Sequence, residues 1–366
     1  MMSNAIVVIV IAARFVIPLA IPRYPLPAIV AALVLDAADQ SIFSAFGVEF
    51  TNYQGYDKAL DVFYLTIAYV STIRNWTDGV PFRTVRFLWY YRLVGVVAFE
   101  LIGARPLLLI FPNTFEYFFI FYEVVRLRWE PSRLRRPHVL GVAAGIWIVI
   151  KIPQEWWIHI AKLDVTDVVG GNPWLWFPIG AVAATAVGLF LAYRQRLPEA
   201  DWPISMNVDA HPTTVVGEAA DPPLGWWAPI EHPLVEKTLL VTLVCVIFAE
   251  VLPTNELDLV QLTVGIAVLV LLNSFVGPWL ASLEASWASF GRVLALTGAV
   301  NVGVVVLVAT VPRSPERPLD VPTSLFFVAL LTLIATLYDR YRSQRLGSIA
   351  ADMPELPPDD EGATGR

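Results

Sequence analysis

Four aspartates lie where one apolar segment of the chain ends and the next begins. Asp36 and Asp39 are three residues apart and Asp57 and Asp61 are four apart, so each pair shares one face of a helix. A carboxylate at membrane depth is costly unless it is paired, bound to metal or facing water. Two adjacent helix ends would bring all four together, and such oxygen donors suit hard divalent cations. The spacing predicts a metal site; the alternative is a buried polar cluster that orients the helices.

The same spacing resembles the signature of the CDP-alcohol phosphotransferases, membrane enzymes that make phospholipids. That signature, Asp-x2-Asp-Gly-x2-Ala-Arg-x8-Gly-x3-Asp-x3-Asp, crosses a helix boundary, and all four aspartates fall on it. The family often carries Arg-x3-Pro in the preceding helix, which matches Arg14 and Pro18 here. The resemblance covers at most the first 160 residues or so, and this chain departs from the signature at Gln40, Phe43, Ser44 and Tyr53.

The resemblance implies a role for each aspartate. Asp36, Asp39 and Asp57 would hold Mg²⁺ or Mn²⁺, and Asp61 would act as the general base. The implied reaction is metal-dependent transfer of a phosphoryl or phosphatidyl group onto a hydroxyl. Membrane lipids would be partners, and a nucleotide-activated lipid or a polyol would be the substrate. The candidate substrate-binding residues in and beside the motif are Arg14, Lys58 and Gln40.

The composition is typical of a polytopic membrane protein. Hydrophobic residues make up 57% of the chain and charged residues only 16%. The single cysteine, Cys245, excludes an intrachain disulfide. The net charge of -7 comes largely from loops and an acidic tail, and no feature indicates a nucleic-acid partner.

Apolar runs long enough to cross a bilayer predict an all-α integral membrane protein, a helix bundle of about eleven (nine to eleven) spans. Residues 1–160 form the front bundle that carries the aspartates, and residues 161–346 add further spans and a polar loop at 194–237. The tail 347–366 is predicted to be disordered. The expected spans are 5–22, 27–44, 57–73, 87–103, 106–125, 139–160, 174–193, 238–252, 258–278, 289–311 and 323–341.

Arginines predict how the chain sits in the cell membrane. Loop 126–138 holds five of them, and short basic loops face the cytoplasm. With eleven spans this rule places the carboxyl terminus inside and the aspartates outside. The enzymes that the motif resembles work in bacteria from the cytoplasmic face, so charge pattern and resemblance predict opposite sides for the cluster.

A second polar feature lies in the sixth expected span. Lys151, Glu155 and His159 are spaced i, i+4, i+8 and so fall near one helix face. Such a row suits a proton relay or a contact to an anionic substrate, and the alternative is a self-neutralising Lys151–Glu155 pair. The row favours a second hypothesis, an ion- or proton-coupled transporter. A third is a non-catalytic membrane scaffold. The oligomeric state stays open.

Overall fold

The computed structural model describes residues 2–48, 53–76, 78–161, 198–210, 232–251, 287–310 and 321–351, with single positions inside 177–192 and 266–270. Every regular element in these ranges is a helix, which confirms the all-helical class. The α-helices are α1 (Met2–Val16), α2 (Pro25–Ala45), α3 (Tyr53–Asn75), α4 (Gly79–Ile102), α5 (Pro106–Ile110), α6 (Thr114–Arg126), α7 (Arg136–Gly145), α8 (Ile152–Glu155), α12 (Pro233–Val251), α14 (Trp287–Thr310) and α15 (Val321–Ala351). The 3₁₀ turns are η1 (Ile17–Ala20), η2 (Pro131–Arg133) and η7 (Val208–Ala210), and the π-helices are η3 (Ile146–Lys151) and η4 (Trp156–Ile160).

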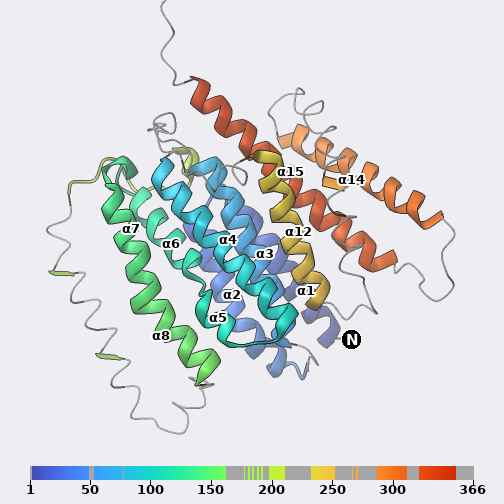
Figure 1. The fold of residues 1–366 in the computed structure, drawn as a ribbon, viewed down its shortest axis with the longest axis horizontal. Coiled ribbons are helices and arrows are strands. Elements are labelled where there is room, and N and C mark those ends of the chain that lie inside the picture. Colours follow the sequence, from blue (N-terminus) through green and yellow to red (C-terminus); the bar gives the residue numbers. More distant parts are fainter. Residues whose placement is uncertain are drawn as a thin grey trace, which may run out of the picture.

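The helices form one bundle, with α7 and α8 along one side and α14 along the other (Figure 1). Helix α3 occupies the centre, because it packs against α1, α2, α4, α12 and α15. Its most extensive contact is with α15, the last helix in the sequence. The helix that carries two of the four aspartates is therefore held on nearly every side by protein.

The sequence of α3 explains its central place. Between its charged ends it is apolar all round, as expected of a buried helix, and Ile67, Ala68, Tyr69 and Val70 have no exposed surface. The hydroxyl of Thr66 donates to the Val62 carbonyl at 2.6 Å, so this buried polar side chain is satisfied within the helix. Large rings fill the space around α3: Tyr69 stacks on Trp89 and Trp76 lies against Tyr122, with centroids 6.0 and 4.0 Å apart.

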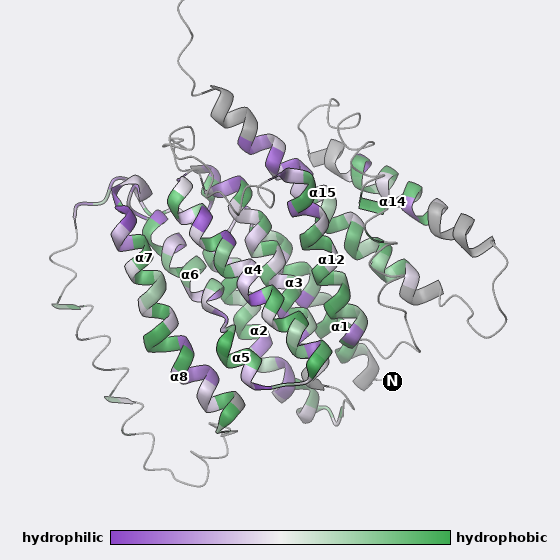
Figure 2. Cartoon of the chain, viewed as in Figure 1, coloured by the Kyte–Doolittle hydropathy of each residue, from purple (hydrophilic) through white to green (hydrophobic). Residues whose placement is uncertain are grey.

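Within the described part of the chain, four helical stretches are long and apolar enough to cross a membrane, which supports a membrane protein but does not confirm about eleven spans. They are Pro25–Ala45, Pro106–Arg126, Arg136–Ile158 and Ser324–Arg345. Hydrophobic residues cover most of the length of the bundle helices, and hydrophilic residues gather towards the ends (Figure 2). Helices α3 and α4 are also long enough to cross a membrane, with 23 and 24 residues, but each carries several charged residues. The expected spans 174–193 and 258–278 lie outside the described residues apart from single positions, as does the tail after Ala351.

Two of these stretches are not continuous α-helix. The expected span 106–125 breaks into α5 and α6 at residues 111–113, where Pro112 cannot donate a helical hydrogen bond. Arg92 and Tyr91 of α4 donate to the carbonyls of Phe111 and Ile110, at 3.0 and 2.8 Å, so the break is satisfied by side chains. The neighbouring stretch 136–160 contains both π-helices, one on each side of the short α8 that holds Pro153.

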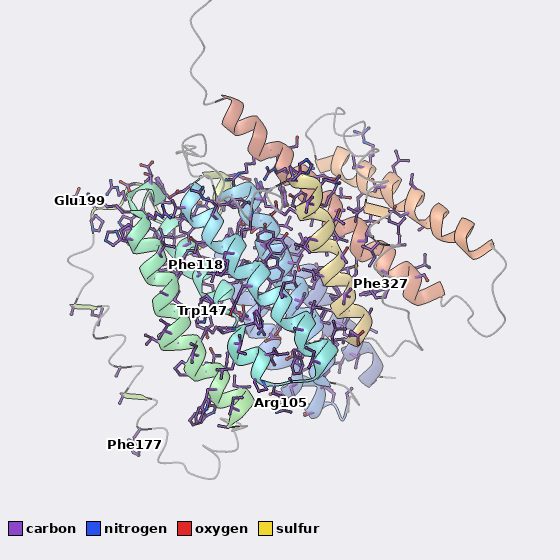
Figure 3. All side chains as sticks on the ribbon, in the orientation of Figure 1. Arg105, Phe118, Trp147, Phe177, Glu199 and Phe327 are labelled. Carbon is purple, nitrogen blue, oxygen red and sulfur yellow. The ribbon has the colours of Figure 1, made fainter. Side chains whose placement is uncertain are left out.

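One end of the bundle is rich in arginine and is crossed by the segment 198–210. The Asp201 side chain accepts hydrogen bonds from Arg133 and from the Glu130 backbone, and Trp202 donates to the Arg126 carbonyl at 3.0 Å. Asp209 pairs with Arg74 at the end of α3. Glu199 lies at this end and Arg105 at the opposite one (Figure 3). The segment therefore ties together helix ends that are far apart in the sequence.

Candidate functional site

The four aspartates converge, and they do so on Arg14. One terminal nitrogen of its guanidinium, Nη1, donates to Asp39 and to Asp57, the latter at 3.0 Å. The other, Nη2, donates to Asp36 and to Asp61, the latter at 3.1 Å. Each terminal nitrogen thus holds two carboxylates, and one arginine joins all four. We call Arg14 with these four residues the aspartate cluster.

Three helices bring the aspartate cluster together. Arg14 lies near the end of α1, Asp36 and Asp39 face it from α2, and Asp57 and Asp61 face it from α3. The spacings of three and four residues place each pair on one helical face, as the sequence predicts. The packing of α1, α2 and α3 against one another then sets the two pairs opposite each other.

The aspartate cluster is closed on one side and accessible on the other. Arg14 and Asp39 are buried, with 3% and 0% of their side-chain surface exposed. The side chains of Asp36, Asp57 and Asp61 keep between 25% and 34% of theirs. A small ion or a ligand group therefore has access to the cluster past these three side chains.

Carboxylate oxygens of Asp36, Asp39 and Asp57 all lie within 4.8 Å of one another. Oxygen ligands of Mg²⁺ or Ca²⁺ lie about 2.0–2.6 Å from the ion, so two ligands on opposite sides of it are separated by about 4–5 Å. The three oxygens therefore already have the spacing of a cation's ligands. The geometry fits a divalent cation, and the position between these oxygens is the one that the Arg14 guanidinium contacts.

When all four of its carboxylates are ionised, the charges of the aspartate cluster do not balance. Four ionised carboxylates and one guanidinium leave an excess of three negative charges. Coulomb repulsion between carboxylates is large where water is scarce, because the effective dielectric constant is low. A bound divalent cation would reduce this excess, which is the electrostatic reason to regard the cluster as a cation site.

Two further candidate substrate residues do not take part in the cluster's hydrogen bonds. Lys58 lies against α4, where its Nζ is 3.6 Å from Glu100 Oε1 and 3.9 Å from the centre of the Phe99 ring. Gln40 is exposed, one residue after the buried Asp39. Of the three candidate substrate residues, Arg14 is the one that the structure brings to the four aspartates.

A second polar group lies next to the aspartate cluster. Tyr64, one helical turn after Asp61, donates to Glu116 Oε2 at 3.2 Å, and the Asn113 side chain donates to the same oxygen at 2.6 Å. The backbone N–H of Asn113 donates to Glu155 Oε1 at 3.3 Å. This group therefore connects α3 to the helix break and to the π-helical stretch.

Lys151 and Glu155 of the expected relay are both buried, with 4% and 5% of their surface exposed. The Lys151 ammonium lies 3.9 Å from the centre of the Tyr117 ring, a cation–π contact. The side chain of His159 lies outside the described residues. Asn113 links this row to Glu116: its backbone N–H donates to Glu155 and its side chain donates to Glu116. The spacing in the sequence did not predict this connection.

A buried glutamate at the arginine-rich half of the bundle was missed by sequence reasoning. Glu236 of α12 has no exposed surface; it accepts hydrogen bonds from Tyr69 and from Tyr338, the latter at 2.8 Å, and lies 3.3 Å from Arg86 Nε. It stands just before an apolar run, so it reads as a residue outside the membrane. Its partner Arg86 lies within α4. An arginine inside a largely apolar helix is the sequence signal that could have indicated a buried acidic partner.

The chain matches no family model, and no curated protein and no solved structure is detectably similar to it.

Proposed function

We propose that the chain is a membrane-embedded transferase that binds a divalent cation, Mg²⁺ or Mn²⁺, at the aspartate cluster and transfers a phosphoryl or phosphatidyl group onto a hydroxyl. The observation that carries this proposal is the convergence of four carboxylates from two helices, three of them with oxygens at ligand spacing. The half-intact motif of the CDP-alcohol phosphotransferases gives the class of reaction.

The residues divide into ligands and a base. Asp36, Asp39 and Asp57 hold the cation, whose chemistry is to neutralise the charge of a diphosphate. Asp61 is the residue left for proton transfer, and its partly exposed side chain reaches the accessible side of the cluster. The acceptor hydroxyl loses its proton to Asp61, its oxygen forms a bond to the transferred phosphorus, and the bond from that phosphorus to the leaving nucleoside monophosphate breaks.

The partners follow from the position of the cluster. It lies among helices that are hydrophobic over most of their length (Figure 2), so a lipid can supply the activated donor or the acceptor hydroxyl. The donor is a nucleotide-activated lipid or polyol, because a diphosphate provides both the oxygens that a metal binds and the leaving group.

The test combines cation binding with product release. Purified full-length protein is incubated with Mn²⁺, a CDP-linked lipid and a set of polyol acceptors, and CMP release is measured. Asp61→Asn should abolish CMP release while leaving Mn²⁺ binding intact, and Asp57→Asn should weaken Mn²⁺ binding itself. The matched control is Asp201→Asn at the arginine-rich end, which should behave like wild type. Wild-type protein that neither binds Mn²⁺ nor releases CMP rules the proposal out.

A second candidate function, ion- or proton-coupled transport, is favoured by the helix break. Broken helices and π-turns at membrane depth occur where a membrane protein lines a site or a path. Here both meet at the buried Lys151 and Glu155. Uptake of a proton or cation by liposomes that contain the protein, lost in Glu155→Gln, would favour a carrier. A protein inactive in both assays would be a scaffold.

A further inference from the structure

The cation that the aspartate cluster holds in this structure is its own arginine. Arg14 contacts all four carboxylates, including Asp36, Asp39 and Asp57, whose oxygens lie at ligand spacing. A divalent cation at 2.0–2.6 Å from these oxygens needs the same lone pairs and the same space. The guanidinium and the metal therefore exclude each other from this position.

We propose that Arg14 is a tethered occupant of the cation site: it keeps the four carboxylates together when no metal is bound, and it leaves when a divalent cation enters. The inference rests on the proposed cation site and adds its regulation. Arg14 then sets the apparent affinity of the site, because every binding event must first break its four contacts.

The charge balance makes this exchange selective. Exchange of the guanidinium for a divalent cation lowers the excess negative charge in the carboxylate site from three to two. A monovalent cation leaves the excess at three and replaces a planar group of N–H donors, which matches carboxylates well, by a bare ion. The tethered arginine therefore favours divalent over monovalent cations.

The surroundings give the displaced guanidinium a place to go. In its bound position the guanidinium already has its central carbon 5.6 Å from the centre of the Tyr56 ring, and an aromatic face of this kind can keep its attraction for the cation after the carboxylate contacts break. Asp36, Asp57 and Asp61 line the accessible side. Under this proposal the guanidinium moves towards that side by a change of side-chain rotamer, which requires no movement of α1.

The experiment measures Mn²⁺ binding to the purified full chain by electron paramagnetic resonance, in which free and bound ions are distinguished. Arg14→Gln should bind Mn²⁺ at least tenfold more tightly than wild type, and Mn²⁺ should raise its melting temperature by more. Arg14→Lys, which keeps the charge but loses the planar group, should fall between the two. The control is Arg23→Gln, an arginine at the opposite half of the bundle that pairs with Asp209 and should leave Mn²⁺ affinity unchanged.

The outcomes separate this inference from the proposed function. Equal or weaker Mn²⁺ binding in Arg14→Gln overturns the tethered occupant while leaving the metal site in place. Tighter Mn²⁺ binding in Arg14→Gln, together with no CMP release by the wild type, supports the occupant and counts against the transferase. No binding in wild type and in Arg14→Gln ends both. If Arg14→Gln does not fold alone, the pair Asp61→Asn and Arg14→Gln/Asp61→Asn repeats the comparison with one carboxylate fewer and all three ligands retained.

Discussion

At the scale of single residues, the members of the aspartate cluster differ in how many partners they have within it. Arg14 has four acceptors, whereas each aspartate shares one donor group with three others. Removing one carboxylate leaves the guanidinium with three partners, but removing the guanidinium leaves four carboxylates that repel one another. Stability and cation binding therefore depend on these residues in different ways.

The first prediction concerns Asp57. In metal-free detergent solution, Asp57→Asn should change the unfolding free energy by less than about 1 kcal/mol, because one shared hydrogen bond is weakened while repulsion is relieved. Thermal unfolding of the variant and of Asp201→Asn measures this. A large loss of stability in Asp57→Asn alone would mean that each carboxylate is required as a structural partner of Arg14.

The second prediction concerns the buried Glu236. Glu236→Gln should destabilise the fold by about 3–5 kcal/mol, because it removes the charge that faces the buried Arg86. Tyr338→Phe, which removes one hydrogen bond to the same carboxylate and keeps the ring, should cost only about 0.5–1.5 kcal/mol. Similar losses in the two variants would show that the charge of Glu236 has no special role.

At the scale of elements, the close approach of α4 to the helix break depends on a glycine. A Cβ built at Gly95 would lie 2.1 Å from Phe111 Cβ, which belongs to the interrupted backbone between α5 and α6. Gly95→Ala should therefore push the two elements apart and destabilise the fold by about 1–3 kcal/mol.

The control for that change is Gly141→Ala in α7, where a Cβ meets nothing within 4 Å. It should be neutral or stabilising by up to about 1 kcal/mol, because alanine favours helix over glycine. Melting temperatures of the two variants decide the point, and equal behaviour would mean that Phe111 moves aside without loss.

The sequence predicts elements better than it predicts their partners. The helical class and the shared faces of the two aspartate pairs follow from periodicity, which is a local property. The central role of Arg14 does not, because its four contacts join residues 22 to 47 positions apart. The break after Ile110 has a local signal in Pro112, but the same residue type at Pro153 lies within a continuous helical stretch, between two π-helices. Such outcomes depend on neighbours from distant parts of the chain.

At the scale of the whole molecule, the two ends of the bundle differ in charge, which fixes a testable orientation. With Cys245→Ala as background, Ser132→Cys at the arginine-rich end should resist an impermeant thiol reagent in intact cells, and Arg105→Cys at the other end should react. Both positions are exposed and should react after permeabilisation. The reverse pattern would place the aspartate cluster nearer the cytoplasmic face.

The central position of α3 has a consequence for how the protein is made. Its largest contact is α15, which begins at Val321, whereas α3 ends at Asn75. At about 5–20 residues per second, α3 is synthesised roughly 10–50 s before its main partner exists. During that time its charged end and the hydroxyls and rings of its interior face must be shielded from lipid by α1, α2 and α4 or by the insertion machinery. Chains truncated before α15 should therefore be targets of membrane quality control.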